Sequence, residues 1–195
     1  MLCLDLKGFG ENTGMEYPYS LADYLQEVKE YMYKKGVACP HVIAHSFGAR
    51  IAIKGASEDK YLFNKLCLTG AAGLKPHTTI KKKIKKIAFN LAKKVFPREK
   101  LSMFYSSDYR ALSPVMKESF KLIVGENLDD RLEFIQNSTL LIFGDKDRET
   151  PLYMAKRLNA GIKNSSLSVY KGAGHFCFID KPLKFNMEVR EFLLS

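Results

Sequence analysis

Short apolar segments of strand length alternate with segments of helical periodicity along most of this chain. The apolar segments cover residues 1–5, 41–44, 66–68, 139–143 and 167–170. The helical patterns between and after them begin after Ser20, at Ala49, at Leu152 and at Pro182. Continuously apolar strands that alternate with helices are typical of a parallel sheet with helices on both faces. The sequence therefore predicts an α/β fold with a mostly parallel sheet.

The alternation is interrupted between residues 74 and 137, where only helical patterns are found. One apolar stripe there has helical spacing and consists of Ile80, Ile84, Ile87, Leu91 and Val95. Ser113 followed by Pro114 is a typical helix start, because proline fits the first helical position. We predict one α/β core formed by residues 1–73 and 138–195, with residues 74–137 inserted as a helical cap.

The positive charge of the chain is concentrated in this predicted cap. The net charge is +10, and residues 81–94 contain seven lysines, so the rest of the chain carries about +3. Such local basicity argues against a nucleic-acid-binding surface. We expect a cap helix with solvated lysines, and the alternative is weak contact of residues 81–94 with an anionic membrane surface.

The sequence also indicates a cytoplasmic protein. No apolar run approaches the roughly 18 residues of a membrane span, and the first residues lack the pattern of a secretory signal. The four cysteines show no C-x-x-C spacing, which favours reduced thiols over a disulfide or zinc framework. His41 and His77 have no partner at ligand spacing, so we expect no metal and no cofactor.

Ser46 lies at the apex of a predicted strand-to-helix turn, in the segment Ala44-His45-Ser46-Phe47-Gly48. A nucleophile in such a sharp turn requires small residues two positions before and after it, and Ala44 and Gly48 meet this requirement. The turn exposes the serine oxygen at a helix N-terminus, where developing negative charge is stabilised. The pentapeptide by itself is a weak signal, since short serine turns of this composition are common.

Two further polar turns follow predicted strands downstream. One is Gly144-Asp145-Lys146-Asp147, with Pro151 shortly after it, and the other is Gly172-Ala173-Gly174-His175. Serine, aspartate and histidine therefore each follow the carboxyl end of a strand, the edge at which open α/β sheets form their ligand sites. Their order along the chain is that of the α/β-hydrolase triad.

These motifs together resemble the α/β-hydrolase superfamily over essentially all 195 residues. The turn at residues 5–10 resembles the turn after the family's fourth strand, and residues 74–137 sit where the family carries its cap. Similar members are small bacterial esterase-like proteins with a helical cap, a group that includes carbon–carbon bond hydrolases of ring-cleavage products. The serine at the apex of the strand-to-helix turn argues against dehalogenase and epoxide-hydrolase members, which use aspartate at that position.

The resemblance implies that Ser46 is the nucleophile, that His175 is general base and then acid, and that Asp147 fixes the histidine tautomer. Asp145 is a rival for the acid, but Asp147 matches the family spacing of glycine, two residues and aspartate. The N–H of Phe47 is the expected oxyanion donor. His45 flanks the nucleophile, and we expect its side chain to point away from the reaction.

One departure from the family lies at the start of the chain. Members have a further strand before the one predicted here at residues 1–5, and the loop after it usually donates the second oxyanion hydrogen bond. Without that strand, residues 1–5 and 41–44 would lie two strand spacings apart, about 9.6 Å. Either these segments pair directly in a rearranged sheet or the natural protein is longer. We expect the second, with Met1 an internal start, a truncated gene model or a degraded reading frame.

The resemblance implies a serine hydrolase that cleaves an ester or similar small carbonyl substrate through an acyl-enzyme. The alternatives are a truncated, non-catalytic remnant of the fold and a carbon–carbon bond hydrolase with the same triad. Three cap residues are candidates for the substrate pocket: Met103, Phe104 and Tyr105. Substrate identity and oligomeric state are not predicted by these patterns.

Overall fold

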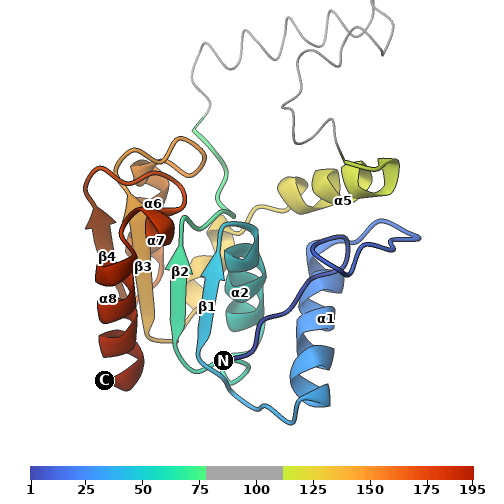
Figure 1. Ribbon diagram of the computed structural model, residues 1–195, viewed down its shortest axis with the longest axis horizontal. Helices are drawn as coiled ribbons and strands as arrows, with labels where there is room; N and C mark the ends of the chain where they lie inside the picture. Colours follow the sequence, from blue (N-terminus) through green and yellow to red (C-terminus); the bar gives the residue numbers. More distant parts are fainter. Residues whose placement is uncertain (78–111) are drawn as a thin grey trace, which may run out of the picture.

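A four-stranded parallel sheet forms the centre of the protein in the computed structural model, which describes residues 1–77 and 112–195 (Figure 1). The strands lie side by side in the order in which they occur in the sequence. They are β1 (Val42–His45), β2 (Leu66–Thr69), β3 (Thr139–Gly144) and β4 (Ser165–Tyr170). The predicted α/β fold is confirmed, and all four strands coincide with apolar segments of the sequence.

The two faces of the sheet carry separate hydrophobic cores, because successive side chains of a strand point in opposite directions. On one face Leu68 and Leu141 pack with α2 (Phe47–Glu58) and α6 (Leu152–Gly161). On the other face Cys67 and Ile142 pack with α8 (Pro182–Leu194). Helices therefore cover both faces, which explains why the central strands are apolar without interruption.

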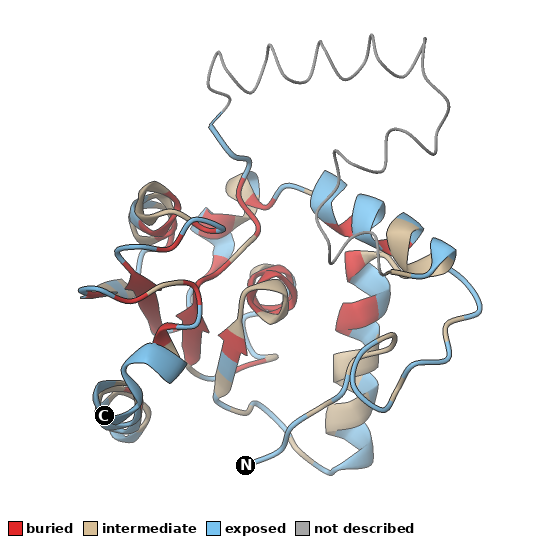
Figure 2. Ribbon diagram, turned by 45° about the horizontal axis from the view of Figure 1, so that its top comes forward, coloured by how far each residue is buried: buried red, intermediate tan, exposed pale blue. Residues whose placement is uncertain are grey.

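Helix α2 is the most enclosed of the described helices, with every residue from Ala49 to Ala56 buried. It lies between the sheet and α1 (Leu21–Lys34), as Figures 1 and 2 show. Helix α1 begins where the sequence indicates, because the Ser20 hydroxyl accepts a hydrogen bond from the Asp23 N–H and the Asp23 carboxylate accepts one from the Ser20 N–H. Because α2 is packed on both sides, the position of Ser46 at its N-terminus is fixed.

The predicted strand at residues 1–5 is wrong. No strand is assigned there, and β1 pairs only with β2 within the described sheet, so these residues do not pair with residues 42–45. Their neighbourhood bonds to α1 instead: the Tyr31 hydroxyl donates to the Cys3 carbonyl, and the Tyr24 hydroxyl donates to the Lys7 carbonyl. An apolar run forms a strand only when a partner strand satisfies its backbone, which composition does not reveal.

The predicted cap lies partly outside the described residues. Within the described part, α5 (Pro114–Gly125) begins at Pro114 as predicted, and the hydroxyl of its N-cap residue Ser113 accepts from the Met116 N–H. A short 3₁₀ helix, η2, spans Asp129–Phe134. The lysine-rich residues 81–94 and the candidate pocket residues Met103, Phe104 and Tyr105 lie outside it. Among the described helices, none is both long and apolar enough to cross a membrane.

Candidate active site

Ser46 stands at the junction of β1 and α2 in a strained backbone conformation. Its φ of 47° and ψ of −105° lie in a region that residues with a Cβ rarely adopt. The Ser46 N–H donates to the Thr69 carbonyl at 3.0 Å, and the Ser46 carbonyl accepts from the Ala72 N–H at 3.3 Å. Its side chain makes no capping hydrogen bond to α2, so the hydroxyl is not consumed by the helix.

The Phe47 N–H is the first backbone donor of α2. The first four N–H groups of a helix have no partner within the helix, and the helix dipole adds positive potential there. Ser46 and Phe47 both line the same pocket. The predicted oxyanion donor therefore lies next to the predicted nucleophile, at a helix end suited to negative charge.

Asp147 and His175 form a buried hydrogen-bonded pair. The His175 Nδ1 lies 2.8 Å from Asp147 Oδ2, and the Asp147 side chain is fully buried. The Thr150 hydroxyl donates to Oδ2 at 2.7 Å, and the N–H groups of Glu149 and Thr150 donate to Oδ1, each at 2.9 Å. Burial by itself would raise the pKa of Asp147, but the hydrogen bonds from His175 and Thr150 outweigh burial and hold that pKa below its ordinary value.

The ionised Asp147 determines which nitrogen of His175 carries the proton. A carboxylate only accepts hydrogen bonds, so Nδ1 is the donor and the lone pair of a neutral ring lies on Nε2. An imidazole held in this way is a general base at Nε2. Asp145, the rival acid, is exposed and accepts from the Gly172 N–H at 2.7 Å, so its carboxylate closes a turn.

Close backbone packing brings the two turns of this pair together. The Lys146 N–H donates to the Ala173 carbonyl at 2.9 Å. A Cβ on Gly144, the last residue of β3, would lie 2.2 Å from the same carbonyl oxygen. Glycine is therefore required at this strand end, because any side chain would push away the loop that carries His175.

The ring of His45 packs against the ring of His175. The two ring centroids lie 4.6 Å apart, and Nδ1 of His45 lies 2.9 Å from the Thr69 hydroxyl. Burial, together with the neighbouring His175, lowers the pKa of His45. His45 does not line the pocket beside Ser46, but the expectation that it points away from the reaction misses this contact with His175.

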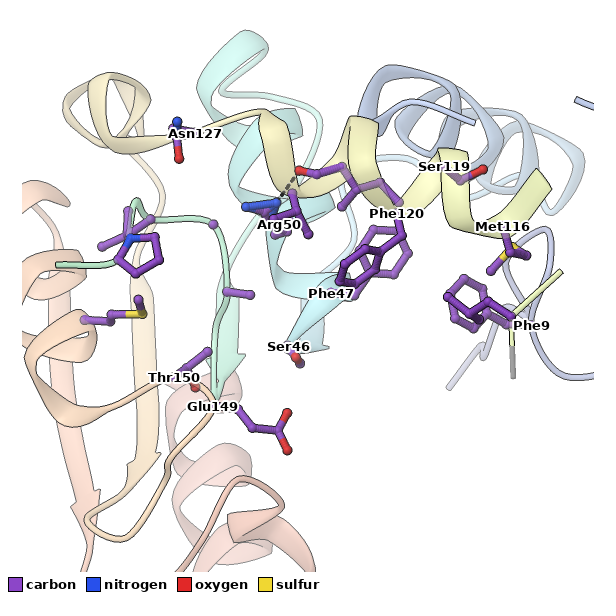
Figure 3. Close-up of a pocket in the computed structure, with 18 residues that line it drawn as sticks. Phe9, Ser46, Phe47, Arg50, Met116, Ser119, Phe120, Asn127, Glu149 and Thr150 are labelled. Atoms are coloured by element: carbon purple, nitrogen blue, oxygen red, sulfur yellow. Dashed lines mark hydrogen bonds between the residues drawn. The ribbon is translucent and has the colours of Figure 1, made fainter. Parts of the chain in front are cut away.

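A pocket of about 540 Å³ opens beside Ser46 (Figure 3). One end is aromatic and apolar, and Phe9 stacks on Phe47 there with ring centroids 5.7 Å apart. Met116 and Phe120 of α5 also line this end. Sequence reasoning did not find these lining residues, because they come from segments that only the fold brings together.

Glu149 lies at the other side of Ser46, as Figure 3 shows. Its Oε2 is 3.4 Å from Nε2 of His175, and its side chain is 69% exposed. No hydrogen bond joins Ser46 to His175 in the part of the chain that the structure describes. The same part holds no group of three or more histidine, cysteine, aspartate or glutamate side chains suited to a metal ion.

A strained serine at a strand-to-helix turn, a buried aspartate–histidine pair and a parallel sheet are features typical of α/β hydrolases. The model of the alpha/beta hydrolase family matches residues 1–188, and the chain therefore belongs to this family. Several of its relatives are named as hydrolases.

Individual relatives give a more detailed comparison. A 2-hydroxy-6-oxononadienedioate/2-hydroxy-6-oxononatrienedioate hydrolase of Pseudomonas putida is 43% identical over 63 residues, which are 32% of this chain and 22% of that protein. The AB hydrolase superfamily protein YisY of Bacillus subtilis is 25% identical over 215 aligned positions, covering 97% of this chain and 79% of that protein.

The fold also matches solved structures. The meta-cleavage product hydrolase of Pseudomonas fluorescens IP01 superposes with a TM-score of 0.70 at 22% identity, over 96% of this chain and 77% of that chain. At this level of identity, the match establishes the shared architecture.

Proposed function

We propose that this chain is a serine hydrolase that cleaves esters of small carboxylic acids through a covalent acyl-enzyme. The observation that carries the proposal is the 2.8 Å hydrogen bond between Asp147 and His175, on the loops beside the strained Ser46. A buried carboxylate that fixes the histidine tautomer leaves Nε2 as the base for a nearby hydroxyl. Ser46 meets the remaining requirement, since its hydroxyl caps no helix.

The proposed reaction has two steps. In the first, Ser46 Oγ attacks the substrate carbonyl carbon, its proton passes to His175 Nε2, and the Phe47 N–H stabilises the oxyanion. The bond to the leaving alcohol then breaks, and the alcohol oxygen takes the proton from Nε2. In the second step, water gives a proton to Nε2 and its oxygen attacks the acyl carbon. When this tetrahedral intermediate collapses, the bond from the acyl carbon to Ser46 Oγ breaks, Nε2 returns the proton to Oγ, and the acid is released.

A carbon–carbon bond hydrolase with the same three residues is the second candidate, and the Pseudomonas putida relative supports it. The name of that relative's substrate denotes a dicarboxylate. Among the described lining residues, Arg50 is the one cation, and its guanidinium donates to the backbone carbonyls of Ile123 and Glu126. Glu149 adds a negative charge beside His175. The Glu149 carboxylate would repel a dianionic substrate beside His175, which favours an ester.

Labelling with a fluorophosphonate probe tests the proposal, because such probes react with serines that a base activates. We expect covalent labelling of the purified protein, no labelling of Ser46→Ala, and full labelling of Ser138→Ala, an exposed serine at the far end of β3. Hydrolysis of p-nitrophenyl butyrate should follow the same pattern. A folded protein without labelling or hydrolysis would support the non-catalytic alternative. Cleavage of a ring-cleavage dicarboxylate with no ester hydrolysis would support the second candidate.

A further inference from the structure

Glu149 is the one acidic residue among the described residues that line the pocket. Its backbone is held by a hydrogen bond, whereas its carboxylate extends into the pocket. Its backbone N–H donates to Asp147 Oδ1 at 2.9 Å, so the acid of the pair also holds Glu149 in place. Its side chain is 69% exposed and its carboxylate turns toward the pocket, with Oε2 3.4 Å from His175 Nε2 (Figure 3). A carboxylate held in this way presents negative charge directly beside the proposed base.

Nearby charges within the described residues do not neutralise Glu149 in the pocket. Lys146 and Arg148 belong to the same loop, but both are exposed and neither lines the pocket. Asp147 faces His175, and Arg50 is bound to the carbonyls of Ile123 and Glu126. Among the described lining residues, the pocket beside Ser46 is therefore apolar and aromatic on one side and carries the Glu149 carboxylate on the other.

The position of Glu149 identifies which part of a substrate it faces. In the proposed reaction His175 Nε2 gives its proton to the leaving oxygen, so a group 3.4 Å from Nε2 lies on the leaving-group side. The aromatic side, with Phe9, Phe47 and Phe120, lies across Ser46 from Glu149 and remains for the acyl part (Figure 3).

We propose that Glu149 is a specificity-determining residue that selects esters whose leaving group carries a positive charge, such as esters of amino alcohols, and that disfavours anionic leaving groups. This inference rests on the proposed function of Ser46 and His175. Two unit charges about 5 Å apart at a solvent-exposed site interact strongly enough to change relative rates roughly twofold to fivefold.

A matched pair of thioesters tests this proposal: acetylthiocholine and its uncharged isostere S-(3,3-dimethylbutyl) thioacetate. The measured quantity is the ratio of kcat/KM for the charged substrate to that for the neutral one, from thiol release. A ratio removes any effect of a substitution on His175 that both substrates share. We expect this ratio to be roughly twofold to fivefold lower in Glu149→Gln than in the wild type, and lower still in Glu149→Lys.

The control substitution is Glu191→Gln, which removes the same charge near the end of α8, away from the strand ends that form the site. It should leave the ratio at the wild-type value. A Glu149→Gln ratio equal to the wild-type ratio would overturn the proposal, and so would equal loss of the ratio in Glu191→Gln.

Failure of this inference and failure of the proposed function give different results. If Ser46 is labelled by the fluorophosphonate and p-nitrophenyl butyrate is hydrolysed, an unchanged ratio removes only the role of Glu149. If neither labelling nor hydrolysis is found in the folded protein, the proposed function is wrong and the selectivity proposal falls with it.

Discussion

The ring of His45 lies 4.6 Å from the ring of His175, between centroids, on strand and loop segments separated by 130 positions in the chain. Nδ1 of His45 lies 3.1 Å from the Thr69 carbonyl oxygen and 2.9 Å from the Thr69 hydroxyl oxygen. Nε2 of His45 is buried without a partner. His45, whose pKa burial lowers, is thus a neutral ring that packs against the ring of His175, the proposed base.

This neutral His45 predicts a pH-dependent stability. Its pKa is lowered in the folded protein, so on acidification the unfolded chain takes up the proton first. The stability that neutral His45 contributes to the folded protein is fully present above its unfolded pKa of about 6.5. This stability is lost as the pH falls from 6.5 through the lower pKa of His45 in the folded protein. Urea unfolding should therefore show a smaller loss of stability between pH 7.5 and pH 5.5 in His45→Phe than in the wild type. Equal losses would contradict the prediction.

Replacing Asp147 should separate its role from that of Asp145. Asp147→Asn keeps the side-chain shape but no longer fixes the tautomer of His175, and we expect kcat for p-nitrophenyl butyrate to fall roughly 10³-fold to 10⁴-fold. Asp145→Asn alters only the turn that ends at Gly172 and should leave most of the activity. The reverse pattern would identify Asp145 as the acid.

The backbone strain at Ser46 predicts a difference between two inactive variants. Ser46→Gly and Ser46→Ala both lack the hydroxyl, but only glycine adopts a φ of 47° without strain. We expect Ser46→Gly to be about 1 kcal/mol more stable than Ser46→Ala in urea unfolding. At Ser138, which lacks a positive φ, the same pair should show the opposite order.

Gly144 should tolerate no side chain. A Cβ there would lie 2.2 Å from the Ala173 carbonyl oxygen, so Gly144→Ala must displace the loop that carries His175. We expect a loss of about 2–3 kcal/mol in the free energy of unfolding, as for overpacked cores, together with a loss of activity. Gly125→Ala, where no atom lies within 4 Å of the added Cβ, should cost nothing. A harmless Gly144→Ala would show that the loop adjusts.

The local patterns of the sequence predicted most of the described elements. Strands β1 to β4 and helices α1, α2, α5, α6 and α8 all lie where apolar runs and helical spacing place them. Capping pairs such as Ser20 with Asp23 act within a few residues, so their signals are readable in the sequence. The positions of Ser46, Asp147 and His175 after strand ends were predicted for the same reason.

Contacts between distant segments were not predictable in this way. Residues 1–5 have the composition of a strand, yet their region bonds to side chains of α1. Phe9 and Phe120 line one pocket although more than a hundred residues separate them. Glu149 carries no motif at all, and only its 3.4 Å approach to His175 distinguishes it from other exposed glutamates.

The sequence by itself therefore determined the alternation of strands and helices, the edge of the sheet at which polar turns gather, and the three residues proposed for the chemistry. These properties depend on spacing and on interactions a few residues long. Only the tertiary structure gave the 2.8 Å distance between Asp147 and His175, the contact of His45 with the same ring, and the position of the Glu149 charge. Each depends on backbone segments brought within hydrogen-bond distance by the packing of the whole sheet, and no local pattern encodes that distance.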